Sequence, residues 1–124
     1  MAFNFKHKPH DGQIFKRSEH ITWNGKKVLL RSSYELEYAL KLDSQKVNYE
    51  VEGLKIKYWN TKLQKYCTAI PDFYLTETNT IIEVKGQYFF DRQEIKDKFK
   101  TYKEKGFNCK LILDGWEVKD VNLI

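Results

Sequence analysis

Two neighbouring apolar segments of the sequence contain three ionisable residues whose types and spacing could support chemistry. Asp72 follows Pro71 at the head of the stretch PDFYL, and Glu83 and Lys85 lie inside the run TIIEVKG at residues 80–86. Ionised side chains within buried strands lose their hydration, which is costly unless they pair with one another or bind a metal. These three residues are therefore the first candidates for a functional site.

Strand geometry predicts how these residues are oriented. Side chains alternate along a strand, so Glu83 and Lys85 share one face while the intervening apolar residues point to the other. Pro71 cannot donate a hydrogen bond to a sheet ladder and belongs at a strand start or edge, from which Asp72 can point across to the neighbouring strand. If the two strands pair through the short connection TETNT, we expect Asp72 and Glu83 to meet.

Converging carboxylates indicate a particular kind of chemistry. Two carboxylates repel each other, and Mg²⁺ removes this penalty by binding both while it keeps waters for a substrate phosphate. A neighbouring lysine can polarise the attacking water and neutralise charge that develops on the phosphate. The three residues thus predict phosphodiester hydrolysis. A simpler interpretation stays open, in which Glu83 and Lys85 form a same-face ion pair and Asp72 is a turn residue after proline.

The elements that must position these residues can be read from periodicity and turn signals. Asn24-Gly25 between apolar runs predicts an entry hairpin over residues 21–31, and the apolar positions that follow predict a helix from about Ser33 to Asp43, capped by Ser32. Four β-branched and aromatic runs then predict successive antiparallel strands, most simply a meander, at residues 47–53, 54–59, 66–75 and 80–86. A second helix is expected between Asp91 and Gly106, and a last strand at residues 107–113.

The combined pattern resembles the PD-(D/E)XK nuclease superfamily. The motif consists of Pro71-Asp72, ten intervening residues and then Glu83-Val84-Lys85. Upstream, the segment RSSYE at residues 31–35 is similar to the part that supplies a further acidic residue in phage endonuclease I-type Holliday-junction resolvases, phage homing endonucleases and the nuclease subunits of some transposases. The resemblance implies an α/β fold, a single domain with an αβββαβ restriction-endonuclease-like core and an N-terminal β-hairpin.

The resemblance also implies roles for individual residues. The catalytic set would be Glu35, Asp72, Glu83 and Lys85, and the metal, Mg²⁺ with Mn²⁺ as a substitute, would be held by Asp72, Glu83, Glu35 and the backbone carbonyl of Val84. No organic cofactor is expected. Ser32-x-x-Glu35 also fits a capping box, in which Glu35 only supports the start of the helix.

The charge balance suits a phosphate-bearing partner. The chain has a net charge of +5 and a pI near 9.1, and its N-terminal third is the most basic portion. We expect a basic arm at residues 1–20 and a nuclease domain at residues 21–124. Most lysines of the second helix are expected to face solvent. The residues predicted to contact DNA are Lys26, Lys27, Arg31, Gln87, Tyr88 and Lys96.

The predicted function is a Mg²⁺-dependent DNA endonuclease that acts, by the resemblance, on branched, Holliday-junction-like DNA as a homodimer. Homing or other site-directed cleavage and a transposase-type cleavage subunit are alternatives. A non-catalytic DNA-binding module is disfavoured because all four candidate residues are present. No apolar run approaches the length of a membrane span and no signal-peptide layout is visible, so a cytoplasmic protein without a membrane partner is expected. Cys67 and Cys109 are expected to be reduced core residues.

Overall fold

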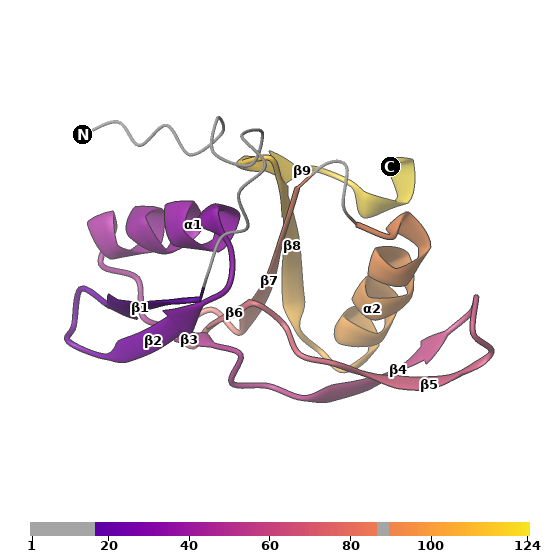
Figure 1. Cartoon of the computed structure of the whole chain (residues 1–124). Helices are drawn as coiled ribbons and strands as arrows, with labels where there is room; N and C mark the ends of the chain where they lie inside the picture. Colours follow the sequence, from indigo (N-terminus) through magenta and orange to yellow (C-terminus); the bar gives the residue numbers. More distant parts are fainter. Residues whose placement is uncertain (1–16, 87–89) are drawn as a thin grey trace.

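The chain is built around a five-stranded mixed sheet (Figure 1), and the computed structural model describes residues 17–86 and 90–124. The helices are α1 (Ser33–Ser44), α2 (Arg92–Glu104) and the short 3₁₀ helix η2 (Val121–Leu123). The strands are β1 (Ser18–Ile21), β2 (Lys27–Leu30), β3 (Tyr49–Val51), β4 (Ile56–Asn60), β5 (Lys65–Ala69), β6 (Phe73–Leu75), β7 (Thr80–Lys85), β8 (Asn108–Leu113) and β9 (Trp116–Val118). The main sheet has the order β3-β6-β7-β8-β9, and β1-β2 and β4-β5 form separate two-stranded sheets.

The centre of the main sheet is the parallel pair of β7 and β8, which α2 connects as a crossover. Strands of this kind are covered on both faces and usually read as continuous apolar runs. In β7 every residue except Lys85 is buried, so the run includes Glu83 as an ionisable residue in the core. The sheet topology therefore determines that Glu83 is buried.

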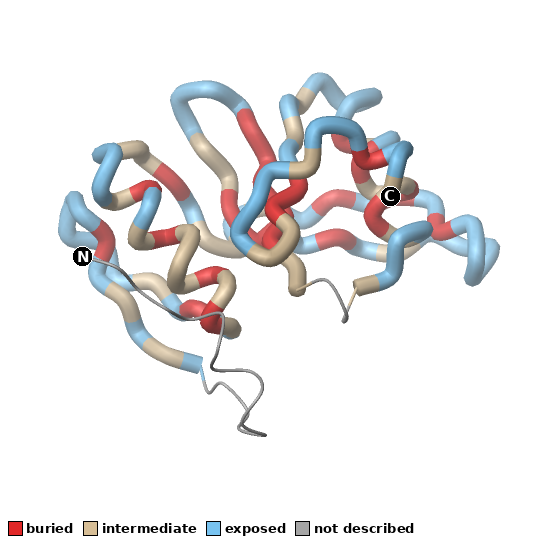
Figure 2. The backbone as a smooth tube through the Cα atoms, turned by 90° about the horizontal axis from the view of Figure 1, so that it is seen from above, coloured by how far each residue is buried: buried red, intermediate tan, exposed pale blue. Residues whose placement is uncertain are grey.

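Two apolar clusters form the core, one on each face of the sheet. α1 and α2 lie on opposite sides of β7 and β8 in Figure 1, and the buried residues follow the central strands and parts of both helices in Figure 2. Ile82 and Val84 belong to the cluster that includes residues of α1, whereas Ile81 packs with residues of α2. The predicted alternation along residues 80–86 is confirmed.

The predicted meander is wrong in its pairing. β3 pairs with β6 rather than with β4, and the β4-β5 hairpin is a separate excursion between them. The expected strand at residues 66–75 is divided into β5 and β6, because Pro71 has no N–H to donate at the division. Alternation identifies a strand but does not select its partner, which is decided by tertiary packing.

The entry hairpin and both helix starts lie where the sequence predicts them. β1 and β2 form the expected hairpin, with Gly25 at a positive φ of 87° in its loop. Ser32 caps α1 by accepting a hydrogen bond from the Glu35 N–H, and Asp91 caps α2. Strand β9, which pairs with β8, was not expected. Within residues 17–86 and 90–124, no helix has the length and apolar content that a membrane span requires.

Candidate active site

Asp72 and Glu83 lie side by side where the β6-β7 ladder ends. The last paired residues are Phe73 and Ile82, so the next residue on each strand is a carboxylate. Asp72 Oδ2 accepts a hydrogen bond from the Val84 N–H at 2.8 Å, in the place where a ladder carbonyl would otherwise accept it. The exposed fractions are 9% for Asp72 and 1% for Glu83. The two carboxylates therefore converge as expected, and they do so inside the core.

The same strand ending directs a backbone carbonyl toward this pair. A strand residue presents its N–H and its C=O to the same neighbour. Because the Val84 N–H is bonded to Asp72, the Val84 carbonyl is directed to the same edge of β7, beyond the end of β6. Two carboxylates and one carbonyl thus converge at this point.

Lys85 lies at the partly exposed side of the carboxylate pair. Its Nζ is 3.9 Å from Glu83 Oε1, and its side chain is 28% exposed. The charge of Lys85 lowers the pKa values of both Asp72 and Glu83, which partly offsets the effect of their burial. This is the same-face pair that alternation predicted.

Glu35 lies at the start of α1 and also near the carboxylate pair. Its Oε1 accepts the Arg31 N–H at 3.2 Å, and its Oε2 lies 3.5 Å from Ser32 Oγ, so it supports the start of α1. Burial and then the charge of Asp72 raise the pKa of Glu35 to about 7. The carboxylate is therefore close enough to the pair to interact with it electrostatically while it caps the helix.

Two residues of α2 that the sequence did not assign to the site complete it. The Tyr102 hydroxyl donates a hydrogen bond to Glu83 Oε2 at 2.7 Å. Most lysines of this helix were expected to face solvent, but the side chain of Lys98 is only 13% exposed, and its charge acts on both Asp72 and Glu83. The spacing of Ile95, Lys98 and Tyr102 at i, i+3 and i+7 is a signal that could have placed Lys98 on the buried face.

Burial and the charge of Asp72 favour the protonated forms of the carboxyl groups in the site. Burial, followed by the charge of Asp72, raises the pKa of Glu83 to about 7. Burial likewise raises the pKa of Asp72, although Lys85 and the Val84 N–H act against this increase. Burial lowers the pKa of Lys98, but Glu83 and its ion pair with Glu94 outweigh that effect and hold it above its usual value. Without a bound cation, the charged forms of Asp72 and Glu83 therefore destabilise the folded protein.

The raised pKa of Glu83 predicts a pH-dependent stability. Its pKa is about 7 in the folded protein and near 4.5 without the fold, so between these values the folded state holds more protons. The contribution to stability is complete below about pH 4.5 and is lost as pH rises through about 7. In chelator, we expect the wild type to lose on the order of 2 kcal/mol of unfolding free energy relative to Glu83→Gln between about pH 5 and about pH 8.

Urea unfolding followed by circular dichroism measures this difference. Comparison of the two proteins cancels the contributions of titrating groups that do not interact with Glu83. Parallel pH profiles for the wild type and Glu83→Gln would contradict the prediction.

The donor atoms of the site suit a hard divalent cation. Among residues 17–86 and 90–124, no group of three or more His, Cys, Asp and Glu side chains is placed to hold a metal ion. Mg²⁺, however, is usually bound through one or two carboxylates, and waters and substrate phosphates supply the other ligands. Asp72 and Glu83, with the Val84 carbonyl at the same edge, fit that smaller requirement.

The predicted DNA contacts that lie within the described residues are spread over the β1-β2 hairpin, the start of α1 and α2. Arg31 lies beside the site, with its Nε 2.8 Å from an oxygen of Glu52, whose charge acts on Asp72. Lys26 and Lys27 belong to the β1-β2 hairpin, at the opposite end of the molecule from α2 (Figure 1).

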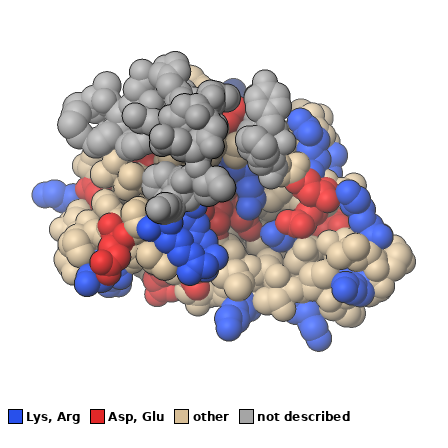
Figure 3. Space-filling view, viewed as in Figure 1, with Lys and Arg blue, Asp and Glu red and all other residues tan. Residues whose placement is uncertain are grey.

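Lys96 on α2 lines a groove of about 620 Å³ near η2. Gln87 and Tyr88 lie outside the described residues. Basic and acidic side chains are mixed on the face in Figure 3.

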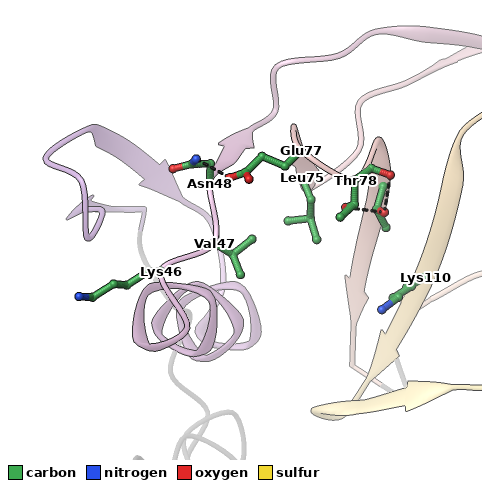
Figure 4. Close-up of a pocket in the computed structure, with 8 residues that line it drawn as sticks. Lys46, Val47, Asn48, Leu75, Glu77, Thr78 and Lys110 are labelled. Atoms are coloured by element: carbon green, nitrogen blue, oxygen red, sulfur yellow. Dashed lines mark hydrogen bonds between the residues drawn. The ribbon is translucent and has the colours of Figure 1, made fainter.

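A second groove lies at the other end of the sheet. Figure 4 shows it between the end of α1 and the starts of the central strands, with Val47 and Leu75 among its lining residues and a volume of about 360 Å³. Glu77 there accepts a hydrogen bond from Asn48 at 2.6 Å. None of the candidate catalytic residues lines this groove.

Comparison of the chain with protein-family models, with curated proteins and with solved structures found no match. The described residues by themselves define a small α/β domain with two helices and mixed sheets. The site is defined by its own geometry, namely buried carboxylates next to a partly exposed lysine.

Proposed function

We propose that the protein is a Mg²⁺-dependent DNA endonuclease that hydrolyses phosphodiester bonds. The observation that carries the proposal is the burial of Asp72 and Glu83 side by side, with Lys85 next to them. Burial raises the pKa values of both carboxylates, and the charge of Asp72 raises that of Glu83 further. Such an arrangement reduces stability unless a ligand compensates for it, and strongly shifted groups of this kind cluster at functional sites.

Each residue of the proposed site has its own chemical role. Asp72, Glu83 and the Val84 carbonyl would hold the metal, which when bound polarises the phosphate and lowers the pKa of a coordinated water. Lys85 stabilises the charge that develops on the phosphate. Glu35 would bind the metal or orient the attacking water. The Tyr102 hydroxyl fixes the rotamer of Glu83, so that its other oxygen stays directed at the site.

The order of elements supports a restriction-endonuclease-like core. When the β4-β5 hairpin and the edge strand β9 are left out, the elements around the main sheet run α1, β3, β6, β7, α2 and β8. This is the αβββαβ order that the resemblance implies, with the β1-β2 hairpin in front of it. Action on branched DNA as a homodimer follows from the same resemblance, with site-directed cleavage as the alternative.

The proposal predicts a strict metal requirement. We expect cleavage of DNA with Mg²⁺ or Mn²⁺, none with excess chelator, and binding with little cleavage in Ca²⁺, because Ca²⁺ takes more ligands in a looser geometry than Mg²⁺. A four-way junction, a linear duplex and a single strand, incubated in parallel and resolved on denaturing gels, measure both the requirement and the preferred substrate. Full cleavage in chelator would contradict the role of the carboxylate pair.

A further inference from the structure

One face of the β4-β5 hairpin is exposed although it carries two large aromatic side chains. Trp59 is 41% exposed and Tyr66 is 61% exposed, and the ladder places them directly opposite each other. Their ring centroids lie 5.0 Å apart at an interplanar angle of 75°, which is an edge-to-face pair. This geometry fixes the orientation of both rings and presents them together to solvent.

The other face of the hairpin is occupied by the fold. Buried and exposed residues alternate strictly along β4, and Ile56, Tyr58 and Ala69 pack in the cluster with α2. The exposed face is therefore the outer side of a ribbon whose inner side is fixed to the domain. Figure 1 shows the hairpin extending along one edge of the molecule, past α2.

All charged residues of the hairpin segment are lysines, one of which, Lys62, forms an ion pair with Asp91 at 3.0 Å. Residues 54–70 contain Lys55, Lys57, Lys62 and Lys65 and no Asp or Glu. Lys57 shares the outer face with Trp59, and its Nζ lies 5.3 Å from the centre of the Tyr66 ring. Basic side chains project from the lower edge of Figure 3, where this hairpin lies. A polyanion with aromatic groups complements such a surface.

The hairpin also leads directly into the candidate active site. After β5 the chain passes through Ile70 and Pro71 to Asp72. Six residues of extended chain from Tyr66 to Asp72 span at most about 20 Å. The backbone of Tyr66 is therefore no more than about 20 Å from that of Asp72.

We propose that this outer face binds unpaired nucleotides of a DNA substrate. The aromatic ribbon face comprises Lys55, Lys57, Trp59, Tyr66 and Thr68. Bases stack on Trp59 and Tyr66, and the lysines neutralise the adjoining phosphates. The inference rests on the proposed function, because it assigns to the nuclease a site for the single-stranded part of its substrate. Exposed rings can stack only on bases that are not already stacked in a duplex.

The test is binding of a labelled single-stranded oligothymidylate, measured by fluorescence anisotropy in chelator so that no cleavage occurs. Trp59→Ala and Tyr66→Ala should each weaken binding by about fivefold to a hundredfold, whereas Trp59→Phe, which keeps a ring, should retain most of it. Lys57→Gln should reduce the slope of log affinity against log salt by about 0.7. Trp116→Ala, at another exposed tryptophan on β9, is the matched control and should bind like the wild type.

Specific results would overturn the proposal. One is unchanged oligothymidylate affinity in a folded Trp59→Ala protein. A second is an equal loss of affinity for a duplex and for the single strand in Trp59→Ala or Tyr66→Ala. A third is a Trp59→Ala protein whose dimer dissociates in sedimentation while its DNA affinity stays constant. Failure of the nuclease proposal is distinguishable: a wild type that cuts no DNA, but binds the oligonucleotide through Trp59, supports the aromatic ribbon face and contradicts the catalytic role of Asp72.

Discussion

Asp72→Asn is expected to reduce DNA cleavage in Mg²⁺ by at least about a thousandfold while the domain stays folded. The asparagine keeps an oxygen that can accept the Val84 N–H, so the end of the β6-β7 ladder is preserved. It removes the charge that raises the pKa of Glu83, and with it one ligand of the proposed metal. Measured in chelator at about pH 8, the variant should be at least as resistant to urea as the wild type.

Asp97→Asn is the matched control for this prediction. Asp97 is also buried, but hydrogen bonds from Thr61 and Gln93 outweigh the effect of burial and hold its pKa below the usual value. Its charge is therefore favourable in the fold, and Asp97→Asn should lose stability and keep its cleavage rate per folded molecule. If Asp72→Asn instead lost stability and cut DNA normally, Asp72 would be a structural residue of the strand end.

The convergence of Asp72 and Glu83 could be predicted from the sequence. Asp72, Glu83 and Lys85 were identified because a charged residue interrupts a local pattern of strand residues, and both the pattern and the interruption are visible within residues 71–86. Their convergence then required only that two neighbouring strands pair, which β6 and β7 do. Local sequence was sufficient because the relevant contacts are local.

The parts of the site that come from α2 could not be found in the same way. Tyr102 follows the apolar stripe of its helix, and the sequence does not show that its hydroxyl reaches Glu83. Lys98 lies among other lysines, and only the packing of α2 on the sheet separates it from those that face solvent. Both assignments depend on contacts between elements distant in the chain, which side-chain periodicity does not encode.

The same limit applies to the fold. Both helices were placed within about two residues, because periodicity and caps act over one or two turns. The pairing of β3 with β6 spans the whole β4-β5 hairpin, and no local signal distinguishes it from a meander. That hairpin provides the aromatic ribbon face, so the error in pairing also concealed a candidate binding surface.

Glu35 is the residue for which sequence and structure leave the sharpest choice between capping and catalysis. The structure shows its carboxylate accepting the Arg31 N–H, and also shows its pKa raised to about 7 by burial and by Asp72. Glu37, two residues later, is only half-buried, and its charge acts on Tyr34 instead. The same helix therefore supplies its own control.

Glu35→Gln is expected to remain folded, because the glutamine oxygen can still accept the Arg31 N–H, and to lose cleavage by about a hundredfold or more. The loss arises because an amide can neither take a proton from water nor bind a cation as a carboxylate does. Binding of DNA in Ca²⁺ should stay near normal, and Glu37→Gln should cut like the wild type. Cleavage is compared at equal folded concentration, established by urea unfolding of each protein. Normal cleavage by Glu35→Gln would assign Glu35 to the helix cap alone and reduce the site to Asp72, Glu83 and Lys85.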